Sequence, residues 1–117
     1  YAFDHVDGVL TNKRLFAETP DGYADGPCVD SQGVLHVGLF NGWGVARFAP
    51  SGQRLGTIHL PVQTVTKVAF GGDDLRDLYL TTAWLGNADK RAEQPTLGGL
   101  YRMRVETPGL PQNLVRV

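Results

Sequence analysis

The sequence predicts an all-β protein built from antiparallel sheets, and three observations support this fold class. First, 15 glycines and 7 prolines are scattered along the 117 residues. Second, they separate short runs rich in Val, Leu, Phe and Tyr, which favour strands. Third, turn residues recur at short intervals, as expected where consecutive strands fold back on one another. With 42% hydrophobic and 20% charged residues, the composition is that of an ordinary globular chain with one small core.

Each expected strand ends at a turn signal or at a loop of small and polar residues. Asp-Gly and Asn-Gly pairs mark turns because Gly adopts positive φ freely and Asp and Asn tolerate it. The turn signals lie at 7–8, 30–33, 41–44, 50–52 and 71–74. The expected strands span 1–6, 10–17, 26–30, 34–40, 44–49, 53–60, 65–70, 77–82, 98–105 and 110–116. Residues 91–94 are the only stretch with helical character.

Parts of this strand pattern repeat along the chain. The pattern at 2–8 recurs at 47–52 and more loosely at 101–105, and the segment 29–37 is echoed at 69–80. A period of about 40 to 50 residues, with four strands in each repeat, is typical of the blades of a β-propeller. A β-sandwich is the competing architecture, but internal repetition is not expected of one.

The strand count divides the chain into parts of blades. We predict a partial β-propeller over 1–117, with about two and a half four-stranded antiparallel blades. Residues 1–17 form the outer strands of one blade, 26–60 form a second blade and 65–117 form a third. Such a piece does not close into a ring, since propellers have about 4 to 8 blades. We expect the open faces to be covered by a missing propeller half or by self-association with another copy.

The strand order also sorts the loops, because alternate connections of a meander lie at opposite ends of the sheet. The connections between blades, at 18–25 and 61–64, are expected at the same end as the loops at 41–44 and 83–97. The tight hairpins, among them 30–33, are expected at the other end. The loop at 83–97 is much longer than the roughly 2 to 5 residues usual for hairpins, and is either a lid or a surface decoration.

Asp25 is the candidate for chemistry. It lies where the first connection enters the expected inner strand of the second blade, at the same end as the longest loop. A carboxylate suits Ca²⁺ or Mg²⁺, also binds Zn²⁺, and can act as a base toward a water molecule acidified by a metal. The alternative is that Asp25 and Gly26 form an Asx-type turn, a common use of this dipeptide. The local pattern alone favours the turn.

Several other function classes are disfavoured. The formal charge of −1 offers no basic field for nucleic acid, and no apolar run approaches the roughly 20 residues that cross a bilayer, so neither partner is expected. Because the single Cys28 cannot form an internal disulfide, we expect a reducing, cytoplasmic compartment. The histidines His5, His36 and His59 lie on different expected strands without a shared ligand spacing, so we interpret them as structural.

A succession of short segments carries a family resemblance. The segments are 2–4, 11–14, 25–30, Gly33, 41–42, 60–62, 68–72, 78–83 and 94–101. In this order, and over essentially the whole chain, they resemble the C-terminal half of the SMP-30 (regucalcin), gluconolactonase and luciferin-regenerating-enzyme family.

The resemblance implies a six-bladed propeller with one divalent metal ion, calcium or zinc, at the top of its central channel. It also implies hydrolysis of sugar lactones to aldonic acids by metal-assisted attack of water. The Asp of the family's Pro-Asp-Gly-Met segment is a metal ligand and general base, and Asp25 occupies that position, with Ala24 and Pro27 replacing Pro and Met. The family's remaining ligands, a glutamate and an asparagine, have no counterpart here and are expected outside this chain.

The function expected from the resemblance is the C-terminal part of a metal-dependent sugar lactonase acting on aldonolactones. One carboxylate does not hold Ca²⁺, which takes about 6 to 8 oxygen ligands, or a catalytic Zn²⁺, which takes about three protein ligands. We therefore expect the isolated chain to be inactive. The alternative is a non-catalytic propeller of the same superfamily that serves as a binding or scaffold module.

Overall fold

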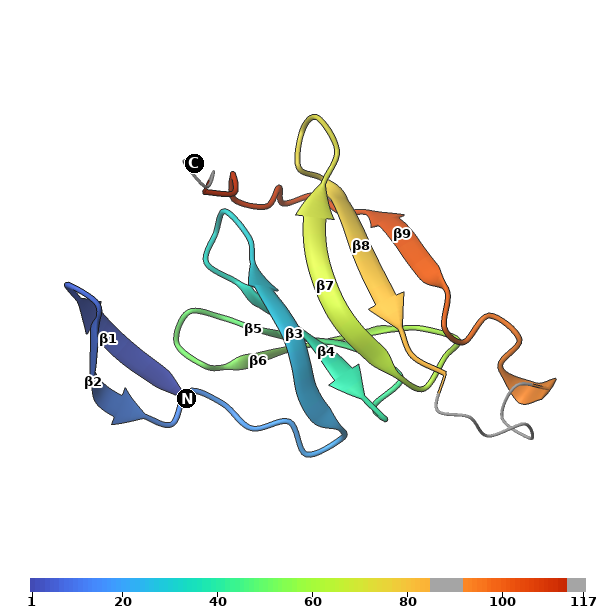
Figure 1. The fold of residues 1–117 in the computed structure, drawn as a ribbon, viewed down its shortest axis with the longest axis horizontal. Coiled ribbons are helices and arrows are strands. Elements are labelled where there is room, and N and C mark those ends of the chain that lie inside the picture. The colour runs from blue at the N-terminus through green and yellow to red at the C-terminus, as the bar shows by residue number, and fades with distance from the viewer. Residues whose placement is uncertain (85–91, 114–117) are drawn as a thin grey trace.

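Short strands joined by tight turns form three antiparallel sheets in the computed structural model, which describes residues 1–84 and 92–113. The first sheet pairs β1 (Ala2–Val6) with β2 (Val9–Arg14). The second has the order β3 (Tyr23–Val29), β4 (Leu35–Phe40), β5 (Gly44–Phe48) and β6 (Arg54–His59). The third has the order β7 (Val65–Gly71), β8 (Asp77–Thr82) and β9 (Leu100–Arg104). Within the described residues each pairing joins consecutive strands (Figure 1), so the predicted all-β antiparallel class is confirmed.

The expected strands differ from the structure most at 10–17, where β2 ends at Arg14, at 26–30 and at 110–116. The strand expected at 26–30 begins earlier, at Tyr23. In the segment expected to form a strand at 110–116, residues 110–113 belong to no strand, and 114–116 lie outside the described residues. The expected helical stretch is represented by Ala92 and Glu93. No helix in the described parts of the chain is long and apolar enough to cross a membrane.

The β1–β2 hairpin stands apart from the other two sheets (Figure 1). Its turn is built by Asp7 and Gly8, whose φ angles of 49° and 81° match the positive-φ turns that hairpins prefer. Asp4 accepts hydrogen bonds from Asn12 and Arg14, each 2.9 Å long, across the two strands. Every residue of the two strands except Ala2 is exposed, so the hairpin has no buried face of its own.

The main core lies between the second and third sheets. Val45 and Leu78 are fully buried there. Successive side chains of a strand point to opposite faces of the sheet, so Val45 points toward β7 and β8 while Ala46 points to the other face. The buried members of this core are Val45, Val65, Val68, Leu78 and Leu80. Burial of these aliphatic side chains holds the two sheets face to face.

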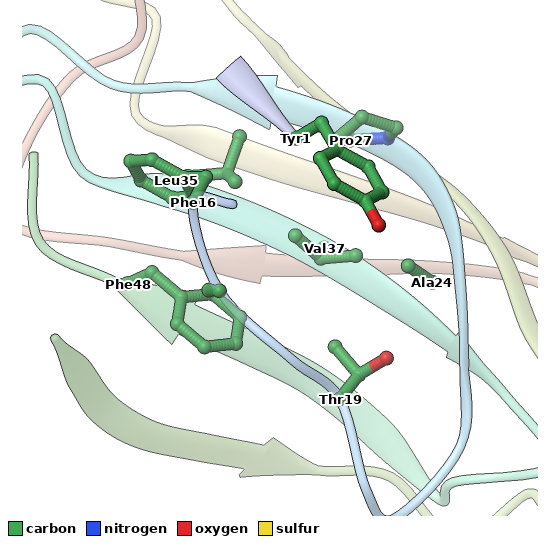
Figure 2. Close-up of a pocket in the computed structure, with 9 residues that line it drawn as sticks. Tyr1, Phe16, Thr19, Ala24, Pro27, Leu35, Val37 and Phe48 are labelled. Atoms are coloured by element: carbon green, nitrogen blue, oxygen red, sulfur yellow. The ribbon is translucent and has the colours of Figure 1, made fainter. Parts of the chain in front are cut away.

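The opposite face of the second sheet is only partly covered. Leu39 and Phe48 on this face pack near Phe16 and Ala17, which belong to the connection that precedes β3. A largely apolar cavity of about 350 Å³ remains between Tyr1, this connection and the sheet, and Figure 2 shows the side chains that line it. Another sheet can pack on an apolar hollow of this kind. That a missing propeller half or a second copy covers it stays a prediction.

The C-terminal segment after β9 crosses the hairpin ends of both larger sheets (Figure 1). The Gly109 N–H donates to the carbonyl of Leu75 in the β7–β8 hairpin, at 2.8 Å. The Ser31 N–H of the β3–β4 hairpin donates to the carbonyl of Pro108, at 2.9 Å. The segment therefore links the two sheets by backbone hydrogen bonds, and not by extending the third sheet as a further strand.

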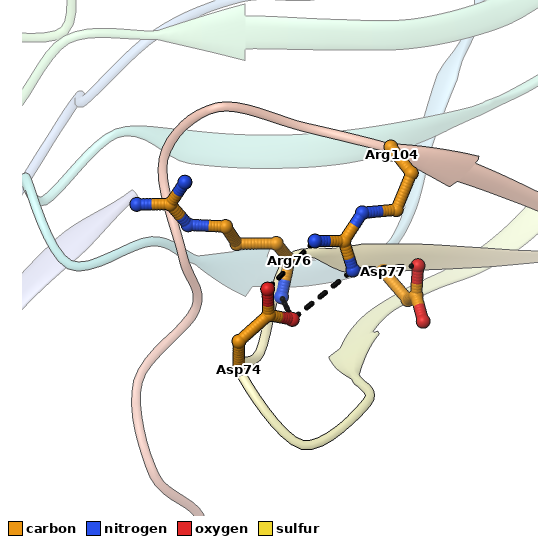
Figure 3. Close-up of polar contacts among 4 residues, drawn as sticks. All are labelled: Asp74, Arg76, Asp77 and Arg104. Carbon is orange, nitrogen blue, oxygen red and sulfur yellow. Dashed lines mark hydrogen bonds and ion pairs between the residues drawn. The ribbon is translucent and has the colours of Figure 1, made fainter.

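An ion-pair cluster, exposed except at the buried Asp77, joins the β7–β8 hairpin to β9 (Figure 3). The Arg104 guanidinium donates to both carboxylate oxygens of Asp74, at 3.0 and 2.6 Å, and to Asp77 at 3.1 Å. Arg76 adds its backbone N–H to Asp74, at 3.2 Å. The hydrogen bonds from Arg104, foremost among these contacts, lower the pKa of Asp74 to about 2.

Replacing Arg104 with Gln is expected to return the pKa of Asp74 toward its ordinary value of 3.8. Because the pKa of Asp74 is lower in the folded protein, the pair stabilises the fold above about pH 4, and this contribution is lost as the pH falls through about 2. An NMR titration of the Asp74 carboxyl group measures the shift. The exposed Arg102→Gln variant is the control, and an equal shift in that variant would contradict the assignment to Arg104.

Candidate functional site

Asp25 is the third residue of β3 and lies opposite Gly38 of β4. The strand continues through this position to Val29, with a β-bulge between Asp25 and Cys28 where Gly26 has a φ of 40°. Within the described residues the Asp25 carboxylate accepts no hydrogen bond and forms no ion pair. The Asx-turn alternative is therefore wrong, because it requires the carboxylate to accept a nearby backbone N–H.

Two glycines let β7 approach the backbone on both sides of Asp25. A Cβ at Gly26 would collide with the Thr66 carbonyl oxygen and lie 2.5 Å from the Lys67 Cα. A Cβ at Gly38 would lie 3.0 Å from the Asp25 carbonyl oxygen and 3.2 Å from Val65 Cγ1. The Lys67 ammonium also donates to the carbonyl of Pro27, at 3.3 Å. The backbone that carries the Asp25 carboxylate is thus fixed between β4 and β7.

Loops from both larger sheets meet at the end of the fold nearest Asp25. The Trp43 N–H donates to the carbonyl of Gln63 at 3.0 Å, and the Thr64 hydroxyl donates to the side-chain oxygen of Asn41 at 3.3 Å. The Ala83 N–H in turn donates to the carbonyl of Thr64, at 3.2 Å. These bonds confirm that the connection before β7 lies at the same end as the loops after β4 and β8.

Gln94 anchors the far end of the long loop to this cluster. The residue is only 4% exposed, and its Oε1 accepts the Gln63 N–H at 2.6 Å. The sequence places Gln94 in the segment 94–101 that carries the family resemblance, but it predicts no role for this side chain. The only local signal was an amide side chain directly before Pro95, where the chain leaves the loop. Residues 85–91 lie outside the described residues, so the lid stays a prediction.

Two threonine hydroxyl groups of β8 form hydrogen bonds at this end of the fold. The Thr82 hydroxyl donates to the carbonyl of Gly99 at 2.9 Å and accepts the Gly98 N–H at 2.9 Å. The Thr81 hydroxyl is 2.9 Å from that of Thr66, which neighbours Lys67 on β7.

An open cavity of about 560 Å³, lined in part by Asp21, Tyr23 and Asn41, lies beside the start of β3. The end that carries Asp25 is therefore polar, hollowed and accessible to a small molecule.

The histidines lie apart from one another, and of the three only His59 lies at this end of the fold, where it pairs with Gly44 at the last position of β6. His36 is buried on β4, with Nε2 3.0 Å from the Asp30 carboxylate, and His5 and His59 are exposed on β1 and β6. The described residues contain no group of three or more His, Cys, Asp or Glu side chains that would hold a metal ion. Asp25 therefore belongs to no such group, and the side chains described here do not complete a metal site.

The fold first defines a class of protein. Antiparallel sheets that follow one another along the chain and pack face to face are blades of a β-propeller. More specifically, the chain belongs to the SMP-30/gluconolactonase/LRE-like family, because a sequence model of the SMP-30/Gluconolactonase/LRE-like region matches residues 1–84. The family resemblance predicted from the sequence is thereby confirmed.

Two curated relatives show the range of names within the family. Regucalcin of Danio rerio is 39% identical over 107 residues, which cover 88% of this chain and 36% of that protein. A 6-deoxy-6-sulfogluconolactonase of Pseudomonas putida is 40% identical over 112 residues, which cover 95% of this chain and 38% of that protein. The chain thus spans about two fifths of the length of these curated relatives.

A solved structure shows the same fold. Regucalcin from Agrobacterium tumefaciens superposes with a TM-score of 0.85 at 24% identity, over 94% of this chain and 39% of that one. This likeness concerns the fold alone. It confirms that the chain forms part of a six-bladed propeller.

The two glycines beside Asp25 allow a direct test of the geometry. Gly26→Ala is expected to lower the free energy of unfolding by about 2 kcal/mol or more, because it combines a strained positive φ with a collision against β7. Gly8→Ala is the matched control, since Gly8 also has a positive φ, of 81°, but a Cβ there meets nothing within 4 Å. Urea unfolding of the whole protein that carries this sequence measures both changes. Equal losses in the two variants would show that the contact with β7 is not a constraint.

Proposed function

We propose that the whole protein carrying this chain is a metal-dependent sugar lactonase in which Asp25 contributes to the reaction centre. The observation that carries the proposal is the Asp25 carboxylate, which is partly buried and fixed by the contacts of Gly26 and Gly38, yet has no internal partner among the described residues. A carboxylate held in this way is available to a ligand. The lactonase name of the Pseudomonas relative supports a lactone as that ligand.

In the proposed reaction, water adds to the carbonyl carbon of the lactone and the ring C–O bond breaks to give a hydroxy acid. Asp25 accepts a proton from the attacking water and returns a proton to the departing ring oxygen. The backbone constraints at Gly26 and Gly38 hold this carboxylate in one position, which favours proton transfer over a fixed short distance. Product release then leaves Asp25 ionised and ready for another turnover.

The proposed cofactor is one divalent cation, Ca²⁺ or Zn²⁺, for which Asp25 supplies one oxygen ligand. A carboxylate oxygen is a ligand that both of these cations accept. When bound, it would polarise the lactone carbonyl. The remaining ligands are expected outside the described residues, because these contain no further group of suitable side chains. It follows that the 117-residue chain on its own is expected to be inactive.

Asp25→Asn is expected to lower the rate of gluconolactone hydrolysis by about 100-fold or more, because the amide keeps the shape of the side chain but cannot accept the proton. Metal content, measured on the same purified protein, is expected to fall with activity. The matched control is Asp73→Asn, which alters an exposed carboxylate in the hairpin at the opposite end of the fold.

Normal hydrolysis and normal metal content in Asp25→Asn would overturn the proposal. If the wild-type protein bound the lactone but did not hydrolyse it in the presence of Ca²⁺ or Zn²⁺, the binding module would be the correct interpretation.

A further inference from the structure

A second cavity lies between the two larger sheets, at the end of β3 opposite to Asp25. Its volume is about 300 Å³, at the lower end of the range found for ligand pockets. Arg47 of β5 and Met103 of β9 line it, so both sheets contribute to its wall. Ile58 and Val105 supply apolar surface. The cavity is therefore small, partly apolar and built by segments far apart in the sequence.

Arg47 brings a positive charge to this cavity without a matching acceptor. The side chain is partly buried, and its Nε is fully buried with no hydrogen-bond partner in the described part of the chain. None of the ion pairs among the described residues involves Arg47. A guanidinium carries five N–H donors, and leaving such donors unpaired in a partly apolar site is unfavourable. The arrangement therefore lacks an anion or another strong acceptor.

Asp30 also lines this cavity, but its carboxylate is already occupied. Asp30 accepts the backbone N–H groups of Gln32 and Val34, at 2.9 and 3.0 Å, and lies 3.0 Å from His36 Nε2. His36 faces Arg47 in the β4–β5 register and is only 5% exposed, with Nδ1 buried and unpartnered in the described structure. The Asp30 carboxylate is thus compensated by three donors, while the donors of Arg47 stay available.

We propose that this cavity binds a small oxyanion, a phosphate or carboxylate group, through the Arg47 guanidinium. The planar fork of an arginine matches both groups by two parallel hydrogen bonds. The apolar wall formed by Ile58, Met103 and Val105 strengthens this attraction because it excludes water from one side. The site is separate from Asp25, so it does not depend on the proposed lactonase reaction.

Glu106 is the second acidic residue that lines the cavity and competes with an anion for Arg47. It is exposed and lines the same cavity, and its carboxylate forms no ion pair with Arg47 in the structure. A negative charge there opposes the entry of an anion. Removal of the Glu106 charge is therefore expected to tighten binding, whereas removal of the Arg47 guanidinium is expected to weaken it. These opposite effects distinguish a specific site from general attraction to a charged surface.

Isothermal titration calorimetry of the whole protein, with inorganic phosphate and with acetate at constant ionic strength, tests the proposal. We expect saturable binding at one site, weakened about 10-fold or more in Arg47→Gln, which removes a charge-assisted hydrogen-bond donor. Glu106→Gln is expected to bind several-fold more tightly. Arg102→Gln, which removes an equal charge from an exposed position on β9, is expected to bind like the wild type. Comparison of the two probes identifies the preferred anion.

Arg47→Lys keeps the charge but removes the planar guanidinium fork. It is the test variant if Arg47→Gln does not fold. It is expected to weaken binding while the thermal unfolding temperature in chloride alone stays close to that of the wild type. The proposal is overturned if neither anion binds to the wild type or to Glu106→Gln. It is equally overturned if Arg47→Lys binds as tightly as the wild type, or if Arg102→Gln loses as much binding as Arg47→Gln.

Discussion

The close approach of β3 to β7 is the constraint on which the rest of the structure depends. It requires Gly26 and Gly38, since a Cβ at either residue presses against backbone or side-chain atoms. Because the two strands come this close, Val45 can pack with Val68 and Leu80 in the core between the second and third sheets. The same approach fixes the Asp25 backbone. One backbone contact therefore underlies the core, the relative position of the sheets and the geometry of the candidate site.

Most strands could be predicted because turn residues and alternating apolar residues are local signals. The strand that carries Asp25 was placed too late because Asp25 and Gly26 resemble a turn, whereas the positive φ of Gly26 forms a bulge inside β3. The strand expected after β9 does not form for another reason. Residues 108 and 109 form backbone hydrogen bonds with two hairpins and not with a neighbouring strand. In both cases a contact between distant segments overrode the local preference.

The candidate site could be predicted only in outline. Strand order correctly placed Asp25 at the end of the fold where the long loop departs from β8, and the family resemblance identified its carboxylate as the group of interest. Gln94 and Arg47 lie in segments that carry the resemblance or the repeat, but nothing local gives their side chains, or Gly38, a role. Gln94 matters because its side chain reaches Gln63, and Arg47 because β9 closes a cavity over it. Such roles arise from tertiary packing and cannot be read from residues considered one at a time.

The C-terminal segment has a consequence for how the chain acquires its structure. Pro108 and Gly109 bond to the β3–β4 and β7–β8 hairpins, and they follow both hairpins in the sequence. During synthesis on a ribosome each hairpin emerges, and can form, before the residues that tie them together. These two hydrogen bonds also join positions widely separated along the chain. The entropic cost of closing such long loops is offset only after the sheets have brought those positions together. The order of translation and the order of assembly thus coincide, with the last residues of this segment securing a structure already formed.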